Sequence, residues 1–159
     1  MNETLTPTEV LDIARQMERN GVAFYSRAAE LYDQPTPRVV FRTLAEREMA
    51  HEKIYAQMQQ RLSESRQIPP DDQEGPSLRA MAGLGVFGLY KDPLKQLTGQ
   101  ESIAQIIRVA IRNEKDSIVF YTGLKDFIHE DAGIRAVNEV IHEEMRHIRM
   151  LSESLEQYE

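Results

Sequence analysis

The sequence predicts an all-α fold, a single bundle of four long helices. Long segments carry apolar residues at steps of three and four, are poor in Gly and Pro, and are separated by short breaker clusters. No segment shows the two-residue alternation typical of half-buried strands. With 159 residues, the chain is long enough to bury one continuous core, and we expect a single domain over residues 1–159.

The first two helices are expected to form an antiparallel hairpin over residues 6–65. The segment 6–9 (Thr-Pro-Thr-Glu) combines a capping residue, a proline suited to the first turn and a glutamate that completes a capping box. The first helix should run to about Tyr32. The Asp-Gln-Pro segment at 33–35 breaks it, and the second helix follows directly and lasts until about Ser65.

The last two helices are expected to form a second hairpin over residues 98–157. The third helix should begin near Thr98, where a second Thr-x-x-Glu pattern ends at Glu101, and run to about Ile128. After a short connection at 129–133, the fourth helix should run nearly to the end of the sequence.

A crossover of residues 66–97, rich in Pro and Gly, joins the two hairpins. Adjacent helix ends need only about 2–8 residues, so this segment is long enough to cross the length of a bundle. Its apolar part, residues 80–90, is too short to span a bilayer; we expect it to pack over the bundle or contact another subunit, with membrane association the weaker alternative. Residues 69–75 should form an exposed loop.

The two hairpins are related in sequence, which indicates a duplicated helical hairpin. An ungapped shift of 96 positions superposes seven identical residues of the first hairpin on the second. The pairs are Ala14 with Ala110, Glu18 with Glu114, Phe24-Tyr25 with Phe120-Tyr121, Glu48-Met49 with Glu144-Met145, and His51 with His147.

Each predicted helix carries a carboxylate in the middle of its inward apolar stripe. The second and fourth helices add an imidazole one turn later on the same face. Several buried carboxylates cannot all stay ionised in an apolar interior without counter-charge, and two divalent cations would supply it. A Glu from each of two helices plus Glu-x-x-His from each of the others is the ligand set of di-iron and di-manganese bundles. The predicted metal ligands are Glu18, Glu48, His51, Glu114, Glu144 and His147.

A single Glu-x-x-His on a helix is more often a solvated surface pair than a metal site. Glu139 and His142 form such a pair in a polar row, so we expect them to face solvent. Glu46, Glu52 and Glu143 also lie off the inward rows and are expected to face water. The metal interpretation is favoured for the other two pairs because both follow a mid-stripe glutamate by 30 residues.

Tyr25 and Tyr121 follow Glu18 and Glu114 by seven residues on the same helix faces. Each phenol is expected either to hydrogen-bond a ligating carboxylate, with a catalytic role in stabilising oxidised intermediates, or to be a core tyrosine that reaches another acceptor. The neighbouring Phe24, Phe120, Met49 and Met145 are assigned to packing.

Composition excludes several function classes. The 19 basic against 26 acidic residues give a net charge of −7, which leaves no basic surface for nucleic acid. The absence of Cys excludes thiolate-bound zinc, iron–sulfur and rubredoxin-type iron sites, so mixed oxygen and nitrogen ligands favour iron or manganese. We find no secretory signal or membrane-spanning run, and therefore expect a cytoplasmic protein.

These residues resemble the ferritin-like superfamily and, within it, the rubrerythrin branch. The resemblance rests on the mid-stripe glutamates with their Phe-Tyr pairs and on Glu48-Met49-Ala50-His51 and Glu143-Glu144-Met145-Arg146-His147. It implies a di-iron bundle, with manganese or a mixed centre as the alternative, that reacts with hydrogen peroxide or dioxygen in oxidative stress. It further implies a homodimer or larger oligomer, bridging roles for Glu48 and Glu144, terminal roles for Glu18 and Glu114, and one metal for each histidine.

Two departures from that branch keep alternatives open. Rubrerythrins proper carry a further carboxylate where this sequence has Ser117, so the symmetric six-residue set resembles a ferroxidase centre as well. With no Cys to ligate its iron, we expect no rubredoxin-like domain, so electrons would come from a separate donor protein or from ferrous iron. We therefore expect a di-iron oxidoreductase, with a ferroxidase or iron-storage protein as the alternative and a metal-free helical interaction module as the lesser one.

Overall fold

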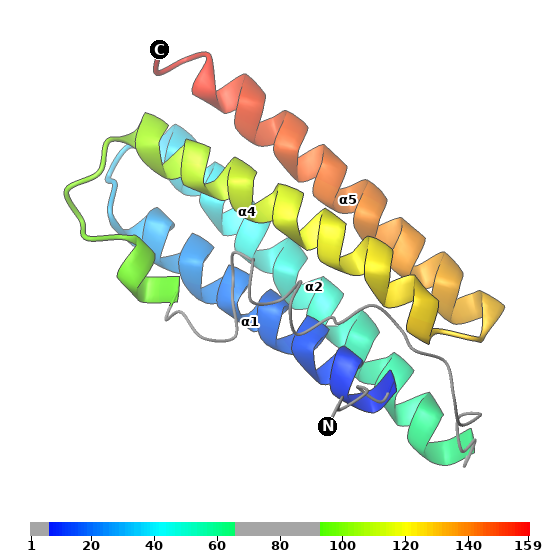
Figure 1. The fold of residues 1–159 in the computed structure, drawn as a ribbon. Helices are drawn as coiled ribbons and strands as arrows, with labels where there is room; N and C mark the ends of the chain where they lie inside the picture. Colours follow the sequence, from blue (N-terminus) through cyan, green and yellow to red (C-terminus); the bar gives the residue numbers. More distant parts are fainter. Residues whose placement is uncertain (1–6, 66–92) are drawn as a thin grey trace, which may run out of the picture.

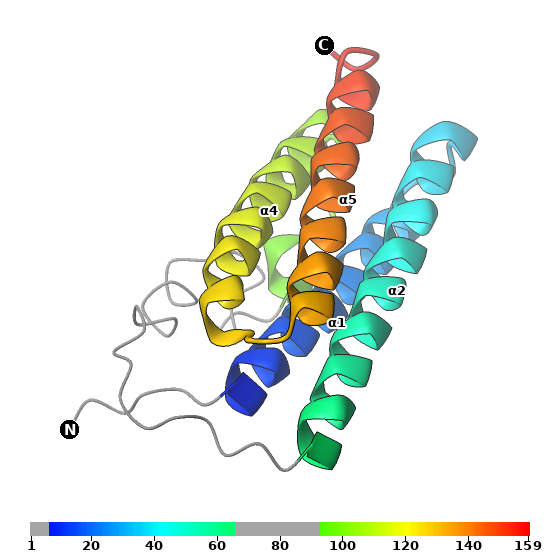
Figure 2. The same cartoon turned by 90° about the vertical axis from the view of Figure 1, so that its right-hand side faces the viewer.

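The computed structural model describes residues 7–65 and 93–159. In these ranges the chain forms four long helices and two short 3-10 helices, and no strand. The elements are α1 Pro7–Glu30, α2 Pro35–Ser65, η1 Pro93–Gln96, α4 Ile103–Leu124, η2 Lys125–Phe127 and α5 Asp131–Leu155. Figures 1 and 2 show α1 antiparallel to α2 and α4 antiparallel to α5, with the two hairpins side by side. The predicted all-α four-helix bundle is confirmed.

The start of α4 differs from the prediction. The hydroxyl of Ser102 accepts a hydrogen bond from the Gln105 amide, and the Gln105 side chain accepts one from the Ser102 amide, which is a complete capping box. Glu101 instead accepts hydrogen bonds from Thr98 and Gly99 in the turn that precedes the helix. Gly99 has φ +88°, a left-handed conformation that a helix cannot continue through, so α4 begins only after this turn.

The α5 helix begins at Asp131, inside the segment expected to be a connection. Gly133 is a helical residue, and a Cβ there would lie 2.7 Å from Cγ2 of Ile128. This glycine therefore allows close packing at the turn between α4 and α5 and does not mark a loop.

The inward stripes predicted from helical spacing form the core. The predicted stripe residues of α1 and α4 are all buried: Leu11, Ala14, Glu18, Gly21, Tyr25 and Ala28 on α1, and Ile107, Ala110, Glu114, Ser117, Tyr121 and Leu124 on α4. The four carboxylates and two histidines lie among apolar side chains. Phe24 and Phe120 are buried as expected. Met49 and Met145 are 47% and 51% exposed, so the packing prediction was wrong for both, because each lies one residue round the helix from a buried glutamate.

The described end of the crossover packs on the bundle. Leu97 is buried, and the Asn113 side chain on α4 donates a hydrogen bond of 3.2 Å to Gln96 in η1. The predictions for segments 69–75 and 80–90 fall outside the described residues. In the part of the chain that is described, no helix is long and apolar enough to cross a membrane.

Candidate metal centre

The four helices bring all six predicted ligands together at mid-height in the bundle. Helical spacing places Glu48 and His51 on one face of α2, and Glu144 and His147 on one face of α5. Each of the six residues, Glu18, Glu48, His51, Glu114, Glu144 and His147, is at most 2% exposed.

The six residues form two overlapping groups whose ligand atoms lie within 4.8 Å of one another. The first group consists of Glu18, Glu48, His51 and Glu144, and the second of Glu48, Glu114, Glu144 and His147. Two carboxylates, those of Glu48 and Glu144, belong to both groups. The arrangement therefore offers two adjacent cation positions with two shared carboxylates.

Both histidines turn Nδ1 toward these carboxylates. Nδ1 of His147 lies 2.8 Å from Oε2 of Glu144 and 3.3 Å from Oε1 of Glu48, and Nδ1 of His51 lies 3.1 Å from Oε1 of Glu144. Ligand atoms about 2.1 Å from a metal ion and at right angles to each other are separated by about 3 Å. The nitrogen and oxygen atoms thus have the spacing that a shared ion requires.

All six residues also carry buried side-chain atoms without a hydrogen-bond partner. These atoms are Oε2 of Glu18 and Glu114, Oε1 of Glu48, both carboxylate oxygens of Glu144, and both ring nitrogens of His51 and His147. Buried polar atoms in proteins are almost always hydrogen-bonded, so a cluster of unpartnered ones signals a missing partner. A pair of cations fits this donor set, which contains only carboxylate and imidazole. The cluster is therefore suited to an iron centre.

Without metal, protons balance the charge of the cluster. Burial raises the pKa of Glu18, raises that of Glu48 well above its ordinary value, and raises that of Glu114 to about 8. Burial alone would lower the pKa of each histidine, but neighbouring carboxylates outweigh it and raise the pKa of His51 to about 11 and of His147 to about 12. Divalent cations would displace these protons.

Glu144 is the exception among the carboxylates. Burial and the charge of Glu48 act to raise its pKa, but His147 and His51 on either side outweigh them and lower it. Glu144 is therefore the carboxylate most readily ionised in the metal-free cluster, and it lies between both imidazoles.

Two tyrosines cross-link the hairpins at the cluster. The hydroxyl of Tyr25 on α1 donates to Glu114 on α4, and the hydroxyl of Tyr121 on α4 donates to Glu18 on α1. Each phenol thus bonds the glutamate of the opposite helix and not the one seven residues before it. Burial raises the pKa of both phenols well above the ordinary value, which keeps them protonated as donors.

Sequence reasoning missed two residues that shape the cluster. A Cβ on Gly21 would lie 2.7 Å from Oε2 of Glu48, so the glycine leaves room for that carboxylate. Tyr55 is fully buried, its hydroxyl has no hydrogen-bond partner, and its ring centroid lies 5.2 Å from that of Tyr121. Both residues belong to inward stripes, and a glycine in the middle of a helical stripe is the signal that could have pointed to a close approach.

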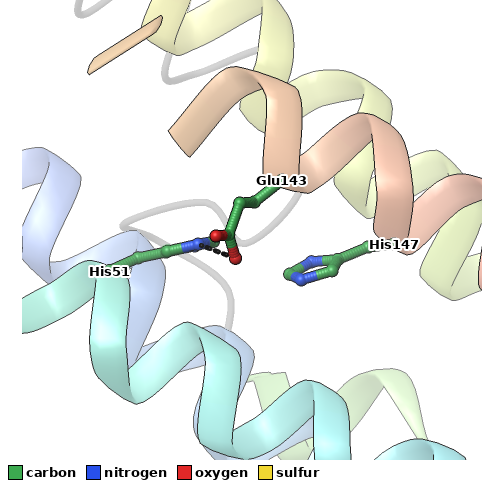
Figure 3. A group of neighbouring side chains, drawn as sticks. All are labelled: His51, Glu143 and His147. Atoms are coloured by element: carbon green, nitrogen blue, oxygen red, sulfur yellow. Dashed lines mark ion pairs between the residues drawn. The ribbon is translucent and has the colours of Figure 1, made fainter. Parts of the chain in front are cut away.

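Glu143 does not simply face water, contrary to expectation. Its side chain is 30% exposed, and Oε2 lies 3.5 Å from Nε2 of His51, as the dashed line in Figure 3 shows. Together with His51 and His147 it forms a third group of candidate ligand atoms. No spacing pattern pointed to this contact, because it joins α5 to α2.

Three other carboxylates, those of Glu46, Glu52 and Glu139, were also predicted to face solvent. Glu46 and Glu139, with His142, are exposed as expected. Glu52 is only 19% exposed and pairs with Arg15 at 2.9 Å and with Arg19 at 3.0 Å, so the prediction was wrong there. Its charge is used to tie α2 to α1.

Comparison with known proteins agrees with the fold. A solved structure described as a ferritin-like diiron-carboxylate protein from Thermotoga maritima superposes with a TM-score of 0.73 at 20% identity, over all of both chains. That likeness shows a shared fold. No curated protein matches the chain. The profile of the rubrerythrin family matches residues 9–155, and the chain therefore belongs to the rubrerythrin family.

Proposed function

We propose that the protein is a rubrerythrin-like di-iron oxidoreductase that reduces hydrogen peroxide or dioxygen with electrons from two ferrous ions. The observation that carries the proposal is the buried set of six Glu and His side chains with unpartnered atoms, arranged as two groups that share Glu48 and Glu144. Manganese or a mixed pair of metals would suit the same donors.

In this proposal Glu48 and Glu144 would serve both metals as bridging ligands, Glu18 and Glu114 would serve one metal each as terminal ligands, and His51 and His147 would each hold one metal. When bound, two ferrous ions would supply the two electrons that, with two protons, are needed to convert one peroxide molecule to two of water. Tyr25 and Tyr121 hold the terminal carboxylates in place, and the surrounding apolar side chains keep bulk water out. Because the chain has no Cys, the returning electrons must come from a separate donor protein or from added ferrous iron.

The test is an anaerobic titration of metal-free protein with ferrous iron, combined with metal analysis. We expect about two iron ions per chain for the wild type and loss of binding in Glu144→Ala. Glu139→Ala is the matched control, because Glu139 lies on the same helix but is exposed. If the wild type binds neither iron nor manganese, the protein is a metal-free helical module and the proposal is wrong.

An iron-loading function, as in a ferroxidase or storage protein, is the second candidate. It is favoured by Ser117, which is buried where rubrerythrins proper carry a further carboxylate, so that the set of six ligands stays symmetric. Stopped-flow oxidation of the ferrous protein by peroxide and by dioxygen, in separate experiments, distinguishes the two functions. Repeated peroxide turnover with a reductant and no net iron accumulation supports the oxidoreductase, whereas mineral growth supports storage.

The proposal also covers the location and the assembly of the protein. We place the protein in the cytoplasm as a homodimer or larger oligomer, without nucleic-acid partners, on the basis of its acidic composition and its family. Light scattering on the metal-loaded protein measures the assembly, and a monomeric mass would contradict it.

A further inference from the structure

We infer that Glu143 is a positioning residue for His51 and makes the two halves of the metal centre unequal. The inference rests on the proposed function, because it concerns the metals that the cluster would hold. It assigns to Glu143 a role that the inward stripes of the sequence do not suggest.

The ring of His51 lies between inner and outer carboxylates. Its Nδ1 faces the cluster, 3.1 Å from Oε1 of Glu144 and 3.6 Å from Oε2 of Glu18. Its Nε2 faces outward, 3.5 Å from Oε2 of Glu143 (Figure 3). If Nδ1 is the metal ligand, the ring proton must reside on Nε2, where Glu143 is placed to accept it.

Two arginines hold the Glu143 carboxylate over this ring. Nη1 of Arg47 lies 3.5 Å from Oε2, and Nη1 of Arg146 lies 3.6 Å from Oε1. Arg47 comes from α2 and Arg146 from α5, so the carboxylate is anchored to the same two helices that supply the histidines. Being partly exposed, Glu143 needs only a small shift of its side chain to reach hydrogen-bond distance from Nε2.

In the duplicated hairpins, no carboxylate occupies the position equivalent to Glu143. The offset that superposes His51 on His147 and Glu48 on Glu144 superposes Arg47 on Glu143. Neither Nε2 makes a hydrogen bond, and Glu143 has ligand atoms within 4.8 Å of both histidines. Among the described residues, however, only His51 forms an ion pair with Glu143 through Nε2, whereas every ion pair of His147 runs through Nδ1. The Glu143 carboxylate therefore lies closer to the ring of His51 than to that of His147, and the equivalent position in the first hairpin is a cation, Arg47.

This difference has a direct consequence for metal binding. A carboxylate that accepts the outer N–H of a ligating histidine fixes its tautomer and makes it a stronger ligand, and loss of such a partner costs about 10- to 100-fold in affinity. The metal position formed by Glu18, Glu48, His51 and Glu144 should therefore fill before the position that contains His147. The centre would load its two metals in order.

The experiment is a Co²⁺ titration of the metal-free full-length chain, followed by visible absorption and by calorimetry. We expect two binding steps of unequal affinity for the wild type. Glu143→Ala should weaken the tighter step by about 10- to 100-fold and leave the weaker step unchanged. Glu143→Gln, whose amide oxygen still accepts a hydrogen bond, should recover part of the loss, and Glu139→Ala should behave as the wild type.

A second measurement separates positioning from a general structural effect. In the Zn²⁺-loaded protein, nitrogen-15 NMR of the histidine side chains should show a slowly exchanging Nε2 proton on His51. Glu143→Ala should make that proton exchange faster without changing the His147 signals.

The two ideas can fail separately. Three results would overturn the role of Glu143: equal affinities of the two steps in the wild type, equal weakening of both steps in Glu143→Ala, or unchanged exchange of the His51 proton in that variant. The proposed function would still stand if Glu144→Ala abolished metal binding. If the wild type binds no metal at all, the proposed function itself is wrong and the inference falls with it.

Discussion

Gly21 is the residue on α1 that leaves space for the Glu48 carboxylate. A Cβ there would lie 2.7 Å from Oε2 and 3.1 Å from Cγ of Glu48, so Gly21→Ala must shift that side chain from its present position. We expect weaker binding at both metal positions, since Glu48 belongs to both groups of candidate ligands. A ferrous or Co²⁺ titration measures the loss.

The duplication supplies a matched control for this substitution. Ser117 occupies the position on α4 that corresponds to Gly21 and already carries a Cβ. Ser117→Ala should therefore keep both metals, and the Gly21 variant should remain helical, because alanine favours helix by about 1 kcal/mol over glycine. Unchanged metal binding in Gly21→Ala would show that Glu48 does not need this space.

Tyr121 and Tyr55 test what a buried hydroxyl contributes. Both are fully buried and their rings are in contact, but only Tyr121 donates a hydrogen bond, to Glu18. Tyr121→Phe should lower the free energy of unfolding of metal-free protein by about 0.5–3 kcal/mol, the range that covers hydrogen bonds to neutral and to charged acceptors. Tyr55→Phe removes a hydroxyl that has no partner and should be neutral or stabilising. Urea unfolding compares the two variants, and equal destabilisation would contradict the assigned contacts.

At the scale of one helix, the cap of α4 is the feature in which the structure differs from the prediction. The structure places the cap at Ser102 and not at Thr98, so Ser102→Ala should cost about 1 kcal/mol and Ser102→Asp should preserve stability. Thermal unfolding of the two variants checks this. A full effect in Ser102→Asp as well would mean that the hydroxyl does not act as a cap.

Helical periodicity accounts for what could be predicted about the elements. Spacing of three and four identifies the inward face of each helix, and this was sufficient to select the six clustered residues. It placed the start of α4 at Thr98 and missed the cap at Ser102, because the positive φ of Gly99 that ends the preceding turn is not visible in a spacing pattern.

Periodicity also fails for residues that act across an interface between helices. Glu143 lies off the inward row of α5, but α2 packs against that side of α5, so the carboxylate reaches His51. Glu52 likewise lies beside the inward row of α2 and pairs with arginines on α1. A spacing pattern describes one helix at a time, whereas these contacts depend on where the neighbouring helix lies.

At the scale of the whole molecule, the buried cluster makes the stability of the metal-free protein depend on pH. Raised pKa values mean that the folded state binds protons that the unfolded state has lost. Glu114, with its pKa raised to about 8, contributes stability that is present below about 4.5 and lost by about pH 8. His51 and His147, raised to about 11 and 12, contribute stability that is present below about 6.5 and lost as pH rises toward those values.

These contributions have the same sign between pH 5 and pH 9, so metal-free protein should lose stability as pH rises across that range. Glu144, whose pKa is lowered, acts in the opposite direction. Its contribution to stability is present above about pH 4.5 and is lost as the pH falls below that value, because the unfolded state then takes up a proton more readily than the folded state. Where the folded state binds one proton more than the unfolded state, the free energy of unfolding falls by about 1.4 kcal/mol per pH unit. Urea unfolding in the presence of a chelator measures this slope.

Metal should reverse the trend, because cations and protons compete for the same atoms. Binding of Mn²⁺ or Zn²⁺ requires deprotonated ligands, so affinity, and with it the stabilisation of the folded state, rises with pH. Unfolding curves of loaded and metal-free protein should therefore diverge steadily from pH 5 to pH 9. Glu139→Ala should show the same divergence, and Glu144→Ala should show none. Parallel curves for loaded and metal-free wild type would mean that the protons held by the cluster are not the ones that metal displaces.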